Sequence, residues 1–218
     1  MSAAASLLRD SASLRPWAAG EGVVVLRGVP WTAYVALNDA VEQKNVKVSY
    51  FRGELELMTR GPRHEVNKKF LARLFELWAL ERDVQIQGYG ETTLRTELAL
   101  AGIEPDECYV VGGPREGTPT PDLAIEVVVT RGALDKLPIY RALGVREVWI
   151  VEAGRIAVHR LGQRGYVAAG TSRLFPSLDV AALARHAAAP DQHTALKAFR
   201  AELQGRPAAV GKKRRPPR

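Results

Sequence analysis

One strand-like segment, "PDLAIEVVVT" (residues 121–130), constrains the fold of this chain more than any other feature. Its run of leucine, isoleucine and valine is typical of a strand that is buried in a sheet. Yet Glu126 lies in the middle of it, and an unpaired carboxylate in such a place is energetically costly. Because side chains alternate along a strand, Glu126 shares its face with Asp122 and Ala124. The segment therefore predicts that Glu126 meets a cation, hydrogen-bond donors or a metal ion.

The residues that follow this strand offer a counter-charge. "GALDKLPIYRALG" predicts a short helix over 133–143, and "REVWIVE" predicts a strand over 146–151. A strand, a helix and a second strand at this spacing form one right-handed crossover, which folds the helix back onto the sheet. Lys136 is thereby the nearest candidate partner of Glu126. A structural ion pair with Lys136 or an arginine would account for the same residues without any chemistry.

The rest of the chain alternates between strand and helix patterns. Two helices are expected upstream and one or two closing helices downstream, with short strands between them. The expected helices cover 31–43, 61–83, 177–188 and 191–203, and the expected strands cover 46–51, 54–58, 84–90, 91–98, 106–111, 154–161 and 165–169. This order predicts an α/β fold, a mixed sheet with helices on its faces.

The chain is expected to divide into a core domain with appendages. The predicted parts are an N-terminal extension over 1–29, the domain over 30–180, closing helices over 181–205 that pack on it, and a tail over 206–218. Of the net charge of +7, six positive charges lie in that tail, which has no acidic residue. We expect the tail to be disordered, with Lys212, Lys213, Arg214 and Arg215 as candidate nucleic-acid contacts through counterion release. A solvated terminus that only aids solubility is the alternative.

Cysteine content and hydropathy limit the other classes of protein. Cys108 is the single cysteine, so the chain has neither a disulfide framework nor a cysteine-based zinc site. No apolar run approaches the roughly 18 residues that cross a bilayer, and the N-terminus lacks the pattern of a signal peptide. We therefore expect a cytoplasmic protein with no membrane partner.

A second carboxylate accompanies Glu126. Asp106 stands at the start of the strand over 106–111, directly after Pro105. Two carboxylates on adjacent strands, with a lysine, suit a hard cation such as magnesium, and the lysine can steady an attacking water. Asp106 could also be a simple turn residue. Asp122 lies about 13 Å from Glu126 along an extended strand, so a hydrogen-bonding role at the loop end fits it better than ligation of the same ion.

These motifs together resemble a known group of proteins. "PD" at 105–106, followed after about twenty residues by a strand glutamate, resembles the PD-(D/E)XK nuclease superfamily. More closely, "EPDECYVVGG" and "PDLAIEVVVTRGALDKLPIYRALGVREVWIVEAGRIAVHRL" resemble the Uma-type restriction endonuclease family, as do "GELELMTRGPRHE" and "GETTLR". The similarity covers approximately residues 30–180. It implies a restriction-endonuclease-like mixed β-sheet core flanked by helices.

The resemblance also implies a set of site residues. Asp106 and Glu126 would be the metal ligands, with Mg²⁺ as the ion and Mn²⁺ as the alternative. The superfamily's usual E-x-K lysine would fall on Val128, and the Uma-type pattern places the lysine at Lys136 instead, in "KLPIY". A further acidic residue on the first core helix would be Glu65. The side chains that could line the site are those of His64 and Asp122.

The function that follows is a metal-dependent nuclease that hydrolyses phosphodiester bonds in DNA. Two rivals remain: a catalytically inactive nucleic-acid-binding protein of the same fold, and a partner-binding protein whose carboxylates only form ion pairs. Glu65 and His64 could likewise serve the first turn of a helix. Cleavage of both strands would favour a two-fold homodimer, although no residue of the sequence demonstrates one.

Overall fold

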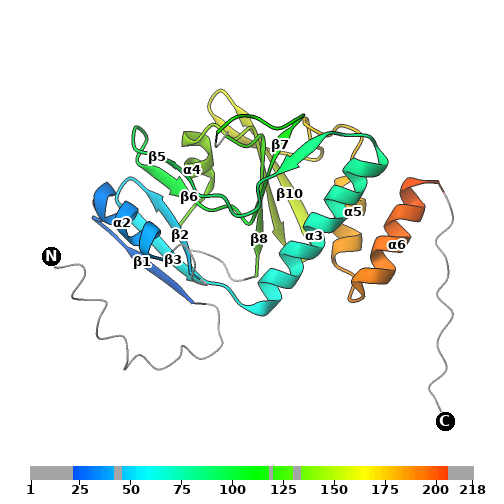
Figure 1. Cartoon of the computed structure of the whole chain (residues 1–218), viewed down its shortest axis with the longest axis horizontal. Helices are drawn as coiled ribbons and strands as arrows, with labels where there is room; N and C mark the ends of the chain where they lie inside the picture. Colours follow the sequence, from blue (N-terminus) through cyan, green and yellow to red (C-terminus); the bar gives the residue numbers. More distant parts are fainter. Residues whose placement is uncertain (1–21, 42–45, 118–119, 130–133, 206–218) are drawn as a thin grey trace, which may run out of the picture.

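The structure is a computed structural model that describes residues 22–41, 46–117, 120–129 and 134–205. Helices are interspersed among the strands along these residues, as Figure 1 shows. The helices are α2 (Trp31–Val41), α3 (Pro62–Glu81), α4 (Leu137–Ala142), α5 (Val180–Ala187) and α6 (Gln192–Leu203). The strands are β1 (Val23–Leu26), β2 (Val46–Phe51), β3 (Glu54–Thr59), β4 (Ile86–Gly88), β5 (Leu94–Thr96), β6 (Ala101–Ile103), β7 (Glu107–Val111), β8 (Leu123–Val128), β9 (Glu147–Glu152), β10 (Arg155–Gly162) and β11 (Gly165–Ala169).

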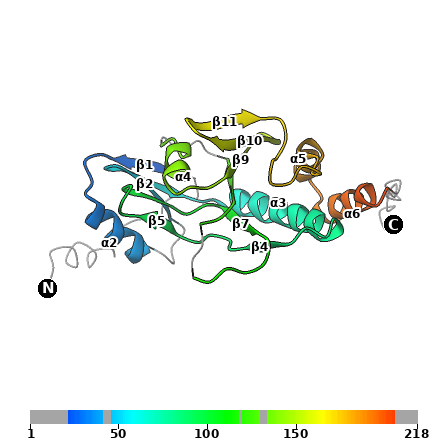
Figure 2. The same ribbon diagram turned by 90° about the horizontal axis from the view of Figure 1, so that it is seen from above.

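The strands form two sheets, which lie next to each other in Figure 2. The five-stranded sheet has the order β1-β3-β2-β6-β5, and the six-stranded sheet has the order β11-β10-β9-β8-β7-β4. The pair β8 and β9 is parallel, whereas the other pairs are antiparallel. The α/β class with a mixed sheet is confirmed, and so is the predicted strand–helix–strand crossover.

Helix α4 lies at the junction of the two sheets, where it contacts β2, β6 and β11. Buried side chains from both sheets meet it there, including Ala101 and Ile103 of β6 and Val148 of β9. The helix is shorter than the predicted range over 133–143. It begins at Leu137 because Pro138 favours the first turn, and Lys136 occupies the N-cap position. This places Lys136 at the sheet junction rather than inside a helix.

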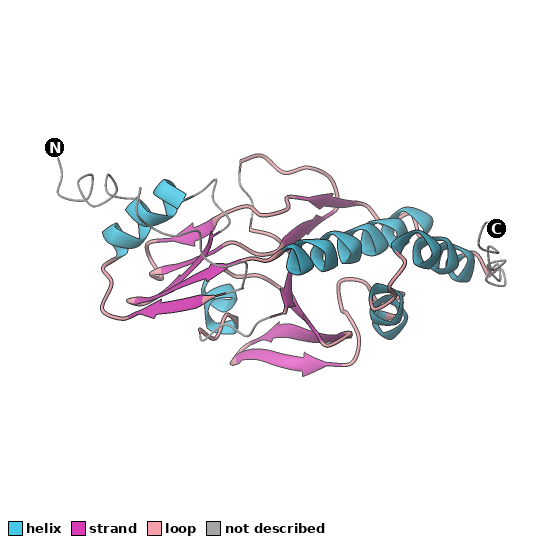
Figure 3. Cartoon of the chain, turned by 90° about the horizontal axis from the view of Figure 1, so that it is seen from below, coloured by secondary structure: helices cyan, strands magenta, loops and turns pink. Residues whose placement is uncertain are grey.

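Helices α3, α5 and α6 pack together beside the six-stranded sheet (Figure 3). Their core is aromatic, and Phe75 makes edge-to-face contacts with Tyr109, Trp149 and Phe175. Such pairs add roughly 0.5–1.5 kcal/mol each beyond the area they bury. The long helix α3 is thereby fixed against β8, with its first turn close to the junction of the sheets.

Two features depart from the expected order of elements. The short strand β6 has no alternating pattern and was not predicted, although all three of its residues are buried. It pairs with β2, and the chain then passes through Glu104 and Pro105 into the other sheet at β7. Strand β1 lies within the segment predicted as an N-terminal extension, and it pairs with β3. The link from β6 to β7 is what places Asp106 between the sheets.

The basic tail over 206–218, with Lys212, Lys213, Arg214 and Arg215, lies outside the described residues. Within the described part of the chain, no helix has the length and hydropathy needed to cross a membrane.

Candidate active site

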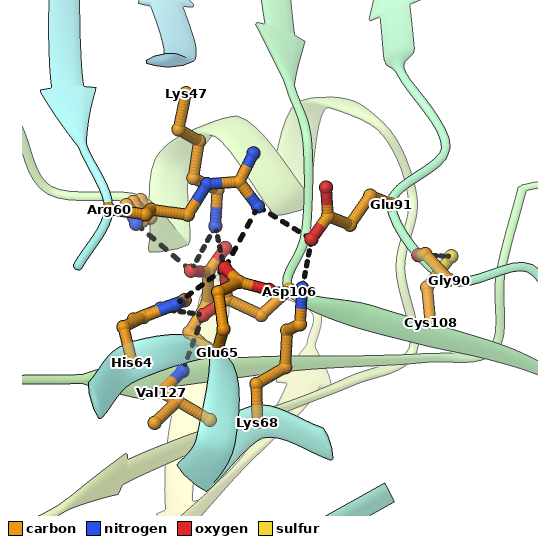
Figure 4. Close-up of polar contacts among 12 residues, drawn as sticks. Lys47, Arg60, His64, Glu65, Lys68, Gly90, Glu91, Asp106, Cys108 and Val127 are labelled. Atoms are coloured by element: carbon orange, nitrogen blue, oxygen red, sulfur yellow. Dashed lines mark hydrogen bonds and ion pairs between the residues drawn. The ribbon is translucent and has the colours of Figure 1, made fainter. Parts of the chain in front are cut away.

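Asp106 lies at the point where the chain passes from one sheet to the other, and its side chain is 1% exposed. Its Oδ2 accepts a hydrogen bond of 2.7 Å from the backbone N–H of Val127 and lies 3.1 Å from Nε2 of His64. Figure 4 shows these contacts converging on Asp106 from β8 and from the first turn of α3. The carboxylate is therefore held in one orientation by groups from two different elements.

Glu126 lies on β8, and it is as deeply buried as the sequence predicts, with 2% exposure. Its Oε1 accepts a hydrogen bond from the hydroxyl of Tyr140 on α4. Its Oε2 accepts from Nζ of Lys136 at 2.9 Å and from Nζ of Lys47 at 2.8 Å. The structure thus brings together Asp106, Glu126 and Lys136, and it gives Glu126 two cations where the sequence suggested one.

Lys47, on β2, is a site residue that sequence reasoning missed. Its Nζ donates 2.8 Å hydrogen bonds to both Oδ1 of Asp106 and Oε2 of Glu126, and its side chain is 3% exposed. The alternation of "VKVSYF" and "ELELM" is that of a hairpin with one solvated face. That face instead meets α4, Leu134 and the two carboxylates, so Lys47 and Glu56 are both buried. The available signal was a lysine near the start of a strand, between Val46 and Val48.

The charges of the site stabilise one another. Burial alone would raise the pKa of Asp106, but the Lys47 ammonium and the His64 ring outweigh it and hold that pKa well below its usual range. Burial would lower the pKa of Lys47 and of His64, and their carboxylate partners instead raise both. The site therefore favours the ionised Asp106 together with protonated Lys47 and His64.

A second layer of charges surrounds His64. Nδ1 of His64 lies 3.2 Å from Oε1 of Glu65, and Oε2 of Glu65 lies 2.6 Å from Nζ of Lys68. Glu91 pairs with Lys68 and with Arg60, as Figure 4 shows. The Glu65 side chain is 46% exposed and reaches Asp106 only through His64. Glu65 is thus placed to orient His64, while His64 touches the candidate metal ligand.

Asp122 lies away from these groups. Its carboxylate accepts a 2.8 Å hydrogen bond from the N–H of Val111 and pairs with Arg115 and Arg146 at 2.9 and 3.1 Å. These contacts join the loop before β8 to the neighbouring strands. Asp122 therefore has the loop-end role that its distance along the strand suggested.

A cavity of about 400 Å³ opens beside the two carboxylates. Its charged wall contains Lys47, His64, Asp106, Glu126 and Lys136, and its apolar wall contains Met58, Leu134, Leu137, Val148 and Ile150. His159 and Glu152 also line it, from β10 and β9. Asp106 and Glu126 are thus buried with respect to bulk water yet face a space that a small ligand or part of a larger one can enter.

The two carboxylates fit a hard cation that keeps most of its waters. One oxygen of each lies 2.8 Å from the Lys47 ammonium, so a metal ion in that position would have two carboxylate ligands. Among the described residues, no group of three or more His, Cys, Asp or Glu side chains is arranged to hold a metal ion. Magnesium commonly binds through one or two carboxylates with water completing its octahedron, so this donor set suits it.

A mixed sheet with a parallel crossover, and two buried carboxylates beside lysines, are consistent with a restriction-endonuclease-like fold. Residues 31–188 match the Uma2 family, whose description is "Putative restriction endonuclease", and the chain belongs to this family. The resemblance of the 105–152 segment is thereby confirmed, and membership points to a nuclease. No curated protein matches the chain.

Proposed function

We propose that the protein is a metal-dependent endonuclease that hydrolyses phosphodiester bonds in DNA at the Asp106–Glu126 site. The observation that supports this most strongly is the convergence of Oδ1 of Asp106 and Oε2 of Glu126 on one cation at the wall of a cavity. Carboxylates that form only structural ion pairs do not require an adjacent cavity. Family membership agrees with this reaction class.

Each residue of the site has a distinct part in the proposed reaction. Asp106 and Glu126 would hold Mg²⁺ or Mn²⁺, which when bound polarises a phosphate oxygen and lowers the pKa of a bound water. Lys136, with 17% side-chain exposure, lines the cavity and donates to Glu126, so its other N–H groups can reach a phosphate oxygen or an attacking water. Tyr140 keeps Glu126 oriented, and Val127 and His64 do the same for Asp106. Glu65 supports His64.

Plasmid cleavage by matched aspartate variants tests this proposal. Asp106→Asn removes the charge of a candidate ligand, and Asp122→Asn makes the same change in a buried aspartate outside the cavity. We expect Mg²⁺- or Mn²⁺-dependent cleavage by the wild type and by folded Asp122→Asn, and no cleavage by Asp106→Asn. Chelation of the ion should abolish cleavage.

Equal cleavage by the two variants would place the chemistry elsewhere. Wild-type protein that leaves both plasmid and single-stranded DNA intact with either ion would instead indicate the inactive, nucleic-acid-binding or partner-binding alternative. The basic tail offers further phosphate contacts, and removal of residues 206–218 should then weaken DNA binding in a salt-dependent way.

A further inference from the structure

Lys47 holds the position between the two candidate metal ligands. It reaches this position from β2 of the five-stranded sheet, whereas Glu126 lies on β8 of the six-stranded sheet and Asp106 in the link between the sheets, and its Nζ lies 2.8 Å from an oxygen of each. The ammonium is the shared counter-ion of Asp106 and Glu126. A divalent cation that binds the same two oxygens has to occupy the same space.

The other oxygens of these carboxylates are fixed without Lys47. Oδ2 of Asp106 accepts from the Val127 N–H and contacts His64, and Oε1 of Glu126 accepts from Tyr140. Among the described residues, Lys47 is the hydrogen-bond partner of Oδ1 of Asp106. Withdrawal of the ammonium would therefore leave both carboxylates in place, with Oδ1 of Asp106 and Oε2 of Glu126 turned toward one point.

Lys47 and Lys136 differ in a way that separates their roles. Lys47 contacts both carboxylates and is 3% exposed, whereas Lys136, among the described residues, pairs with Glu126 alone and is 17% exposed. A cation between the carboxylates would lie where the Lys47 ammonium now lies, and two positive charges in contact within a buried site repel each other strongly. Lys136 donates to the same Oε2 of Glu126 from a position that, among the described residues, makes no hydrogen bond to Asp106, so an ion that replaces the Lys47 ammonium leaves this hydrogen bond in place.

We propose that Lys47 is an internal cation that occupies the metal position in the metal-free protein and that its ammonium withdraws when a divalent ion binds. This inference rests on the proposed function, since it requires that Asp106 and Glu126 are metal ligands. Lys47 is thereby a positioning residue: it keeps two buried carboxylates close together before the ion arrives. It also sets the affinity for the ion, because its two charge-assisted hydrogen bonds must break first.

Isothermal titration of Mn²⁺ into the full chain tests this role through affinity rather than cleavage. The variants are Lys47→Met and Lys47→Gln, and the control is Lys197→Met, which removes an exposed lysine on α6. We expect both Lys47 variants to bind Mn²⁺ about tenfold more tightly or better, and the control to match the wild type. Without Mn²⁺, both Lys47 variants should have lower melting temperatures than the wild type. Mn²⁺ should raise the melting temperatures of the variants by more than it raises that of the wild type.

Each other outcome has a separate meaning. Wild-type protein that binds Mn²⁺ and cleaves, with Lys47 variants that bind no more tightly, would overturn the displacement while the proposed function stands. Lys47 variants that stay unfolded even with Mn²⁺ would also overturn it, because a divalent ion then cannot replace the ammonium. Absence of both Mn²⁺ binding and cleavage in the wild type would refute the proposed function, and this inference with it.

Discussion

Two buried glutamates lie on neighbouring strands, Glu126 on β8 and Glu147 on β9, and their carboxylates are stabilised by different kinds of hydrogen-bond donor. They are 2% and 1% exposed. Glu147 is held mostly by neutral donors, which come from the Ser172 hydroxyl, the backbone N–H groups of Arg173 and Leu174, and the indole of Trp149. Glu126 is held by two lysines and one tyrosine, and it faces the cavity.

The comparison shows that burial alone does not identify a functional carboxylate. The Ser172 hydroxyl and the backbone N–H groups of Arg173 and Leu174 hold Glu147 to the loop over 172–174. None of these donors is a cation that a metal ion could replace. The long side chains of Lys47 and Lys136 can move away from Glu126, and the cavity gives an incoming ion or phosphate access to it. Exchangeable cationic partners and an adjacent cavity are therefore the features that distinguish a site from a structural ion pair.

The largest expected difference between the two glutamates is in catalysis. Glu126→Gln should lower divalent-ion-dependent DNA cleavage by at least about 100-fold, because it weakens a metal ligand. Folded Glu147→Gln should keep cleavage within about threefold of the wild type, since its contacts lie outside the cavity. Cleavage rates at equal concentrations of folded protein would measure this. A greater loss in Glu147→Gln than in Glu126→Gln would break the comparison.

The stability of Glu147→Gln tests the structural role of Glu147. Glu147→Gln turns one accepting oxygen into an NH₂ group among donors, which should lower the free energy of unfolding by about 2–4 kcal/mol. Urea denaturation followed by tryptophan fluorescence would report the change, because Trp149 and Trp78 are buried in the adjoining core. If Glu147→Gln is as stable as the wild type, neutral donors do not explain why this glutamate is buried.

The smallest effect concerns the tyrosine that orients Glu126. Tyr140→Phe removes one hydrogen bond to Oε1, and it should weaken Mn²⁺ binding by roughly tenfold, as loss of an orienting partner typically does. Tyr166→Phe is the matched control, because the Tyr166 hydroxyl donates to the backbone carbonyl of Val145 rather than to a carboxylate. Both variants should lose about 1 kcal/mol of stability. Equal Mn²⁺ affinity in the two variants would mean that Tyr140 only supports the fold.

Local patterns in the sequence were enough to predict much of this arrangement. The crossover from β8 through α4 to β9 follows from apolar runs and turn residues that lie within about thirty positions of one another, and it brings Lys136 to Glu126. The hairpin of β2 and β3 and the long helix α3 were equally visible. Local side-chain periodicity predicts these two elements, and the structure confirms that both are present.

Contacts between the two sheets could not be predicted in the same way. Lys47 contacts Asp106 and Glu126 across 59 and 79 positions of sequence, and no local pattern fixes how the two sheets are placed relative to each other. Three of the donors of Glu147, from Ser172, Arg173 and Leu174, likewise follow it by 25 to 27 positions, in a loop. A charged residue on the expected solvent face of a strand can therefore be either solvated or buried, and only tertiary packing determines which.

Isothermal titration of Mn²⁺ into the wild type and Glu126→Gln tests the central claim most directly, because it needs no assumption about the DNA substrate. We predict that the wild type binds Mn²⁺ and that folded Glu126→Gln shows no binding at the same concentrations. Equal affinity in the two proteins, or no binding by the wild type, would contradict the assignment of Asp106 and Glu126 as metal ligands.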